Sequence, residues 1–115
     1  MRKKNVVFTN KTGTGTSTEV TRRQLMTGGM LRLPVMAKVV ATVGGSPNAT
    51  LKLQGYVTAK ADWMDIADDL TITEAGTYYI DAYALPRCVK YRLNITANTD
   101  VTVTSAEIGV GMVPT

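Results

Sequence analysis

Histidine is absent from this chain of 115 residues, and cysteine occurs once, as Cys88. The lack of histidine removes the commonest general base and the commonest metal ligand of proteins. A Ser-His-Asp site, a Cys-His site and a zinc finger or zinc hydrolase site are therefore excluded within one chain. A single cysteine also excludes an intrachain disulfide. We expect no enzyme activity and no cofactor.

Long apolar runs are missing as well. No stretch of about 18 apolar residues occurs, so the sequence predicts no transmembrane helix and no membrane partner. The basic start at residues 1–4 is typical of the first part of a signal peptide, but residues 5–12 supply no apolar segment after it. We therefore expect the chain to be made and kept, or assembled, in a cytosol.

Aromatic residues are few, and charged residues make up 19%, below the usual quarter. Threonine and valine are abundant instead, with 18 and 13 copies. Residues with a branched β-carbon fit the pleated, half-buried surface of a sheet. This composition indicates an all-β domain.

Alternation of apolar and polar residues is the main pattern of the chain. It predicts about eight strands separated by polar turns, which is typical of a two-sheet antiparallel β-sandwich of immunoglobulin-like or jelly-roll-like type. Residues 44–48 predict a hairpin turn, and a shift of the apolar phase predicts a β-bulge between Val103 and Ala106. The expected core includes Val39, Leu51, Leu53, Trp63, Ile80, Leu93 and Val103.

Charge divides the sequence into two unequal parts. Residues 1–38 have a net charge of +7 and residues 39–115 have −3, which together give the net +4 of the chain. We divide the chain into a basic N-terminal arm with a Gly/Thr-rich loop, residues 1–16, and a β-sandwich domain, residues 17–115. Residues 1–5 lack apolar periodicity, so we expect them to be disordered in a free monomer.

The basic residues of this N-terminal part have two interpretations. They form either a solvated segment that aids solubility or a segment that docks on an acidic partner. In the second case the partner-binding residues are Arg2, Lys3, Lys4, Arg22 and Arg23. Only Phe8 lies near them, and the aromatic side chains on which a single strand would stack are missing, which argues against nucleic acid.

Four acids crowd into eight residues, namely Asp62, Asp65, Asp68 and Asp69. Carboxylates are the ligands that calcium prefers, although the spacing is not that of an EF-hand. A calcium site and a solvated acidic loop both remain open. A pair of acids for glycoside hydrolysis is a weaker interpretation, because so short a chain leaves little room for a cleft.

The larger aromatic residues have alternative interpretations too. Trp63 fits either a core position or a platform on which a sugar stacks. Tyr79 and Tyr83 share a predicted outward face, where they are either ordinary surface residues or interface residues.

Residues 50–104 carry a family resemblance. The segments Leu51-Lys-Leu-Gln-Gly-Tyr, Trp63-Met-Asp-Ile, Gly76-Thr-Tyr-Tyr-Ile, Tyr91-Arg-Leu-Asn-Ile-Thr and Val101-Thr-Val resemble small β-sandwich virion proteins of tailed bacteriophages. Two features depart from that family: the hairpin tip reads Thr58-Ala-Lys-Ala-Asp62, and residues 1–33 have no counterpart. The resemblance implies a head decoration protein, or a tail or fibre-base component, without catalysis.

These observations lead to one main functional expectation. The chain is a capsid decoration or cement protein that binds the major capsid protein or another virion protein. It acts as a homo-oligomer and is located in the virion after assembly in the host cytoplasm. The alternatives are a tail or fibre-base component and a carbohydrate-binding or adhesin module. Exposure of Trp63 separates them, because burial favours the scaffold and exposure beside tyrosines favours sugar.

Overall fold

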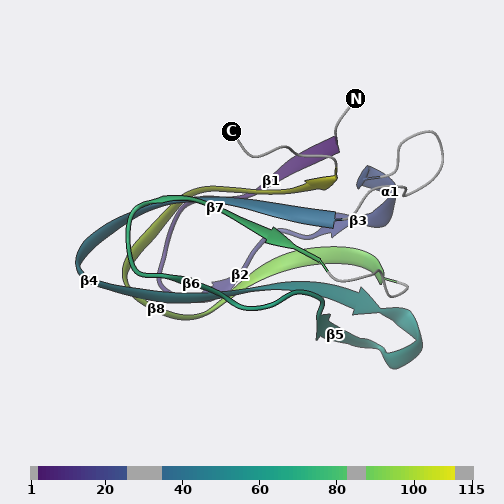
Figure 1. Cartoon of the computed structure of the whole chain (residues 1–115). Coiled ribbons are helices and arrows are strands. Elements are labelled where there is room, and N and C mark those ends of the chain that lie inside the picture. Colours follow the sequence, from purple (N-terminus) through teal and green to yellow (C-terminus); the bar gives the residue numbers. More distant parts are fainter. Residues whose placement is uncertain (1–2, 26–34, 83–87, 111–115) are drawn as a thin grey trace.

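The computed structural model describes residues 3–25, 35–82 and 88–110 (Figure 1). A four-residue helix, α1 (Arg22–Leu25), and a 3-10 turn, η1 (Thr58–Lys60), are the helical elements of this part of the chain. All other elements are strands: β1 (Lys3–Thr12), β2 (Gly15–Thr16), β3 (Val20–Thr21), β4 (Val35–Val57), β5 (Asp62–Asp65), β6 (Leu70–Ile72), β7 (Gly76–Asp81) and β8 (Cys88–Val110). The prediction of an all-β domain with about eight strands is confirmed.

Two strands of 23 residues each, β4 and β8, form the centre of the molecule. They pair antiparallel along their whole length, from Val35 opposite Val110 to Val57 opposite Cys88. We call this pair the central ribbon. Alternate residues of both strands are buried, as their apolar pattern predicts.

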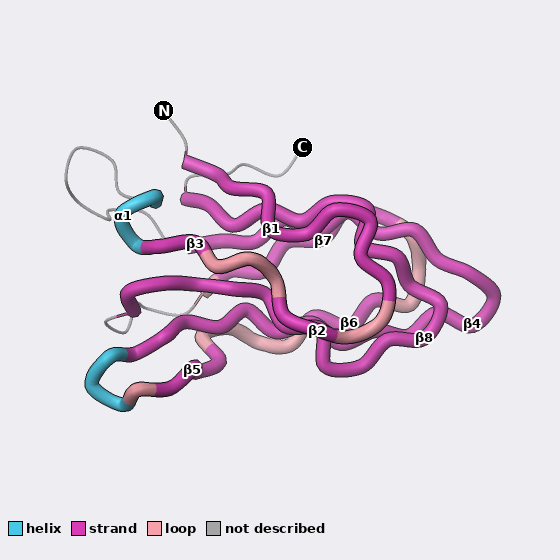
Figure 2. Tube along the Cα trace, turned by 180° about the vertical axis from the view of Figure 1, so that it is seen from behind, coloured by secondary structure: helices cyan, strands magenta, loops and turns pink. Residues whose placement is uncertain are grey.

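The central ribbon is bent, so its two halves lie in two layers that face each other (Figures 1 and 2). Layer A contains β1, residues 101–110 of β8, residues 35–43 of β4, and β7, in that order. Layer B contains residues 88–99 of β8 and 48–57 of β4, with β2 and β3 on one side and β5 and β6 on the other. Two separate sheets are not confirmed, because the hydrogen-bonded ladder is continuous from one layer to the next.

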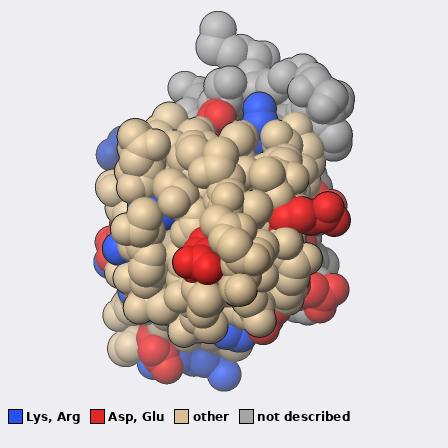
Figure 3. Space-filling view, turned by 90° about the vertical axis from the view of Figure 1, so that its left-hand side faces the viewer, with Lys and Arg blue, Asp and Glu red and all other residues tan. Residues whose placement is uncertain are grey.

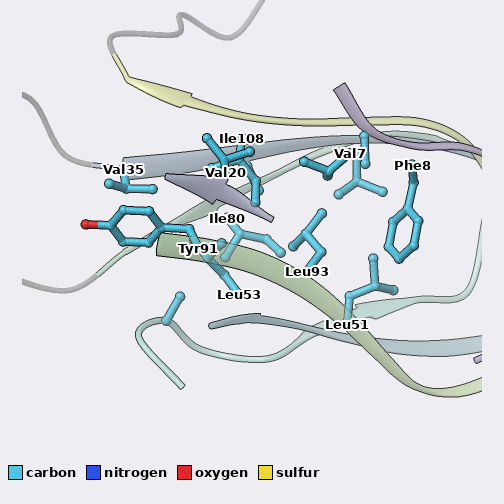
Figure 4. Close-up of a cluster of buried hydrophobic side chains, with 14 of the residues drawn as sticks. Val7, Phe8, Val20, Val35, Leu51, Leu53, Ile80, Tyr91, Leu93 and Ile108 are labelled. Carbon is cyan, nitrogen blue, oxygen red and sulfur yellow. The ribbon is translucent and has the colours of Figure 1, made fainter. Parts of the chain in front are cut away.

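The core lies between the layers. In Figure 4, Val35 and Ile108 come from layer A, whereas Leu53 and Leu93 come from layer B. Of the seven core residues expected from the sequence, six are buried, namely Val39, Leu51, Leu53, Ile80, Leu93 and Val103.

Trp63 is the exception among the expected core residues. It is half-buried and pairs with Tyr56, an outward-facing residue of β4, rather than with inward-facing Leu53 or Val57. The turn at η1 sets this phase because it places Asp62 opposite Val57. The prediction of Trp63 in the core is therefore wrong: its place is on the outer face of layer B.

Residues 44–47 form a corner and not the hairpin turn that we expected. The partner strand continues across this point, with Val43 opposite Val101 and Asn48 opposite Thr99. Four residues of β4 therefore lie opposite Asp100 alone, which has a positive φ of 55° and accepts a hydrogen bond from the Ser46 amide at 3.0 Å. This long bulge carries the ribbon from layer A to layer B.

A second irregularity lies in β8, where Thr104 has no partner in the ladder between Val103 and Ser105. Its hydroxyl donates to the carbonyl oxygen of Val40 at 3.0 Å. The extra residue restores Ala106 to the inner face, and the β-bulge expected between Val103 and Ala106 is confirmed.

The N-terminal segment joins layer A as an edge strand. Residues 3–12, which we assigned to a basic arm, form β1 and pair with β8, beginning with Lys3 opposite Val110. Lys3, Lys4 and Asn5 are thus strand residues, so the disorder expected for them is not seen, whereas Met1 and Arg2 lie outside the described residues. Val7 and Phe8 are both buried, because a bulge between Val6 and Phe8 turns two successive side chains inward.

Candidate functional site

The outer face of layer B brings aromatic and cationic side chains together. The ladder places Lys90 beside Tyr56 and Tyr56 beside Trp63, so three strands contribute one row. The next row contains Arg92, Gln54 and Asp65. We call Tyr56, Trp63, Lys90 and Arg92 the aromatic–cationic patch.

Ring contacts fix the arrangement of this patch. The rings of Tyr56 and Trp63 meet edge to face, with centroids 5.5 Å apart and an interplanar angle of 71°. The Arg92 guanidinium carbon lies 4.0 Å from the centre of the Trp63 ring. The Lys90 ammonium lies 4.9 Å from the centre of Tyr56 and 5.6 Å from that of Trp63. Both cations therefore lie where the negative faces of the rings attract them.

A chain of hydrogen bonds continues from the patch across layer B. Arg92 Nε donates to Gln54 Oε1 at 2.9 Å, and Gln54 Nε2 donates to Asp65 Oδ1 at 3.0 Å. Lys52 Nζ then bonds Asp65 Oδ2 at 3.3 Å and Asp69 Oδ1 at 2.9 Å. This chain restricts the rotamers of Arg92 and Gln54, so the patch is largely ordered before any partner binds.

The ionisation of the chain follows from these contacts. The hydrogen bond from Gln54, followed by the Lys52 ammonium, lowers the pKa of Asp65 against the opposing effect of burial. The hydrogen bonds to Asp69 and Asp65 raise the pKa of Lys52. Both groups are therefore charged at neutral pH.

The two cations of the patch differ in how their charges are balanced. Lys90 Nζ forms an ion pair with Glu19 Oε1 at 3.0 Å. Within the part of the chain that the structure describes, Arg92 has no carboxylate partner and bonds only the amide of Gln54. The positive charge of Arg92 is therefore not neutralised within the described residues, so this side chain is the one on the surface that can bind an acceptor of a partner.

The expected partner-binding bases lie apart from this patch. Lys3 and Lys4 begin β1, while Arg22 and Arg23 belong to α1, which contacts β1, β3 and β8. β3 ends at Thr21, whose side chain and amide bond Gln24 and begin the helix that carries Arg22 and Arg23. Arg2 lies outside the described residues.

Of the two tyrosines that we considered as interface residues, the structure describes only one. Tyr79 lies opposite Lys38 in layer A and is half-buried, and its buried hydroxyl has no hydrogen-bond partner among the residues that the structure describes. Tyr83 lies outside the described residues.

The four clustered acids do not converge on one point. Lys52 bonds Asp65 and Asp69, and the Asp62 carboxylate accepts a hydrogen bond from the amide of Trp63. Asp68 and Asp69 line an open depression of about 240 Å³ together with Tyr79 and Asp81. Among the described residues, no group of three or more potential ligands is arranged to hold a metal ion, so nothing in this geometry supports calcium.

Cys88 lies under the patch, on the inner face of layer B. Burial raises the pKa of its thiol, which keeps it in the neutral, unreactive form. Tyr91 is fully buried nearby, and desolvation by burial raises the pKa of its hydroxyl.

Sequence reasoning missed Tyr56, Gln54, Lys90 and Arg92 as a group. Their alternation with buried neighbours indicates the outward face of each strand, because Lys90 and Arg92 flank Tyr91. Which outward residues become neighbours depends on the register between strands, and the local pattern does not specify that register.

Comparisons with known proteins add no relative. No family model, no curated protein and no solved structure matches this chain. The resemblance to virion proteins of tailed phages therefore stays a prediction. No helix in the described ranges is long and apolar enough to cross a bilayer.

Proposed function

We propose that this chain is a non-enzymatic structural protein that docks on another protein through the outer face of layer B. The observation that carries the proposal is the aromatic–cationic patch, in which Arg92 stacks on Trp63 beside Tyr56. Tryptophan, tyrosine and arginine are the residues most enriched among those that dominate binding energy at protein interfaces.

The arrangement of the patch also favours a protein partner. Its side chains stand on three paired strands and are fixed by ring contacts and by the hydrogen bond to Gln54. Ordering before binding reduces the entropy lost on association. Arg92 would offer its remaining N–H groups to a carboxylate or carbonyl group of the partner.

The setting that we propose is a virion. The sequence resemblance supports a capsid decoration or cement protein that binds the major capsid protein, and the tail or fibre base is the alternative location. In this proposal the chain works as a homo-oligomer and joins the virion in the host cytoplasm. The basic residues Arg2, Lys3, Lys4, Arg22 and Arg23 would add contacts to acidic groups of neighbouring subunits.

Carbohydrate binding is the second candidate, because Trp63 lies on the surface beside a tyrosine rather than in the core. A sugar ring would need a free face of the indole. The guanidinium of Arg92 lies over one face at 4.0 Å and would have to compete with the sugar for it. This contact makes the protein partner the better-supported candidate.

The test is docking of a Trp63→Ala variant. Capsids lacking this protein, prepared from the virus that encodes it, are mixed with the full chain and sedimented. We expect Trp63→Ala to weaken attachment at least about tenfold, as loss of a dominant interface residue does. The matched control is Val40→Ala, a half-buried position on the outer face of layer A, which should bind as the unchanged protein does.

Two results would count against the proposal. Equal attachment of the Trp63→Ala variant and the unchanged protein would remove the patch from docking. Binding of a soluble oligosaccharide that is lost in Trp63→Ala, measured by titration calorimetry, would establish the carbohydrate candidate instead.

A further inference from the structure

The two flanks of the molecule carry opposite charge. On one flank lie β1, β2, β3 and α1, residues 3–25, with five basic residues and Glu19, a net charge of +4. On the other lie β5, β6, β7 and their connections, residues 62–81, with six acidic residues and no base, a net charge of −6. We call them the basic flank and the acidic flank.

The topology places these flanks on opposite sides of the central ribbon. In layer A, β1 pairs with β8 and β7 pairs with β4; in layer B, β3 pairs with β8 and β5 pairs with β4. Figure 3 looks onto the corner end, with red atoms along the right-hand margin and mostly blue atoms along the left-hand margin. The uneven distribution of charge along the sequence thus corresponds to a basic side and an acidic side of the folded molecule.

Charges on both flanks are available to a partner. All six acidic residues are exposed, and of these Glu74 and Asp81 have no basic partner within the described ranges. On the basic flank, Lys11 and Arg23 likewise have no acidic partner there. These four side chains keep their charges for an external contact.

The acidic flank also has a place to receive a basic side chain. The open depression of about 240 Å³ lies there, with carboxylates of Asp69 and Asp81 and apolar walls from Leu70 and Ile80. Tyr79 also lines it, and among the described residues the buried hydroxyl of this tyrosine has no hydrogen-bond partner. An apolar stem with a cationic end, as in lysine or arginine, matches this lining.

Each flank further ends in a sheet edge, since among the described strands β1 pairs only with β8 and β7 only with β4, with one added backbone bond from the Thr18 amide to the Val7 carbonyl at 3.4 Å. Open edges are templates for pairing with another chain. Two basic flanks would repel each other, as would two acidic flanks, so the charges disfavour a two-fold symmetric contact through either flank. Only unlike flanks attract.

We propose that copies of this chain associate head to tail, with the basic flank of one copy on the acidic flank of the next. Such a contact is heterologous, so repetition closes a ring or extends a filament. The inference deepens the proposed homo-oligomer and does not depend on what the oligomer docks on. The aromatic–cationic patch lies on the outer face of layer B, with Trp63 on β5 of the acidic flank and Tyr56, Lys90 and Arg92 on the central ribbon. Docking by the patch therefore uses a different face from the β1 and β7 edges of layer A.

Charge reversal on one flank at a time tests the inference. Sedimentation velocity of the full chain at low salt should show a species heavier than the 12.4 kDa monomer, which should dissociate as salt screens the charges. A Glu74→Lys/Asp81→Lys variant reduces the acidic flank from −6 to −2, and a Lys11→Glu/Arg23→Glu variant reduces the basic flank from +4 to 0, so each should assemble less than the unchanged protein. Since Arg23, Glu74 and Asp81 are exposed and Lys11 is half-buried, circular dichroism should report unchanged folding, and Glu74→Gln/Asp81→Asn replaces the first variant if it does not fold.

The decisive experiment combines the four substitutions in one chain. The chain with all four reversals has the original net charge, and although its flank totals become 0 and −2, the four exchanged positions are again opposite in sign between the flanks. Because the inference places these four side chains at the contact, this chain should assemble better than either double variant. A Thr42→Lys/Thr99→Lys variant, changed at exposed positions away from both flanks, should assemble as the unchanged protein does.

Three results would overturn the inference: a monomer at every concentration and salt, assembly of both double variants equal to that of the unchanged protein, or a fourfold variant that assembles no better than either double variant. The first would also remove the proposed homo-oligomer. The other two would leave that proposal and docking by the patch intact.

Discussion

The two halves of the central ribbon share an inner face and differ on their outer face. Between 35–43 and 101–110, the outward positions are mostly small or aliphatic, as with Val40, Thr42 and Thr102. Between 48–57 and 88–99, they include Lys52, Gln54, Tyr56, Lys90 and Arg92.

The difference separates what folds the chain from what it offers to a partner. Inward residues of both halves are apolar and fully or nearly fully buried, so each half contributes to the same core. Burial of this surface supplies most of the favourable free energy of folding. The long polar and aromatic side chains of layer B add little to that burial, which is why we assign them to binding.

The largest effect should come from the shared inner face. Leu53→Ala in layer B and Ile108→Ala in layer A both remove a fully buried side chain. Each should lower the free energy of unfolding by about 2–5 kcal/mol, measured by denaturant titration. Both variants should show one transition in tryptophan fluorescence and in circular dichroism. If Ile108→Ala melted layer A alone, the idea of one common core would fail.

A smaller effect should come from substitution of Gly55, a position on the inner face of layer B. A Cβ atom at Gly55 would clash with Cys88 Sγ. Gly55→Ala should therefore cost about 1–3 kcal/mol of stability through overpacking. Gly45→Ala, where a Cβ meets nothing within 4 Å, is the matched control and should change stability little.

Removing the sulfur sharpens this test. In a Gly55→Ala/Cys88→Ala variant the closest clash is absent, although Cys88 Cβ remains 3.0 Å from the added atom. The double variant should lose less stability than the sum of the two single variants. Simple additivity in this double-mutant cycle would show that the clash is not the cause.

The smallest effect concerns the outer face of layer B. The pKa of Asp65 is lowered in the folded chain, so its contacts stabilise the fold above the ordinary aspartate pKa, and this contribution is lost as pH falls below about 4. Because the pair with Lys52 is exposed, the contribution is about 0–1 kcal/mol. Asp65→Asn should thus be less stable than the unchanged protein at pH 7, and the gap should close at pH 2–3. A gap that persists at that pH would mean that packing, not charge, is responsible.

Sequence reasoning succeeded where the information was local. The alternation around Leu53 and Leu93 gave the inner face, and the phase shift near Thr104 gave the bulge. Both patterns depend on the period of a single strand. The all-β class and the burial of six of the seven expected core residues follow from such patterns.

The misses depended on how strands combine. Glycine and proline at residues 44–47 are typical of a hairpin, but here they form a corner because β8 continues alongside with Asp100 at the bend. Trp63 is a large apolar residue of the kind expected in a core, but its pairing opposite Tyr56 places its side chain on the outer face. Neither register nor corner is encoded by neighbouring residues alone, so the patch could not be assembled from the sequence.

The continuity of β4 and β8 through both layers has a consequence for folding kinetics. The ribbon joins residues far apart in sequence, from Val57 opposite Cys88 to Val35 opposite Val110. Chains dominated by such non-local contacts fold slowly, on the order of milliseconds to seconds, because loop closure precedes most of the stabilising contacts. The β4–β5 hairpin is the most local pairing of layer B and is therefore a natural starting point. Once β8 pairs there, the corner at Asp100 directs the remaining half of each strand back over the first, so layer A would form last.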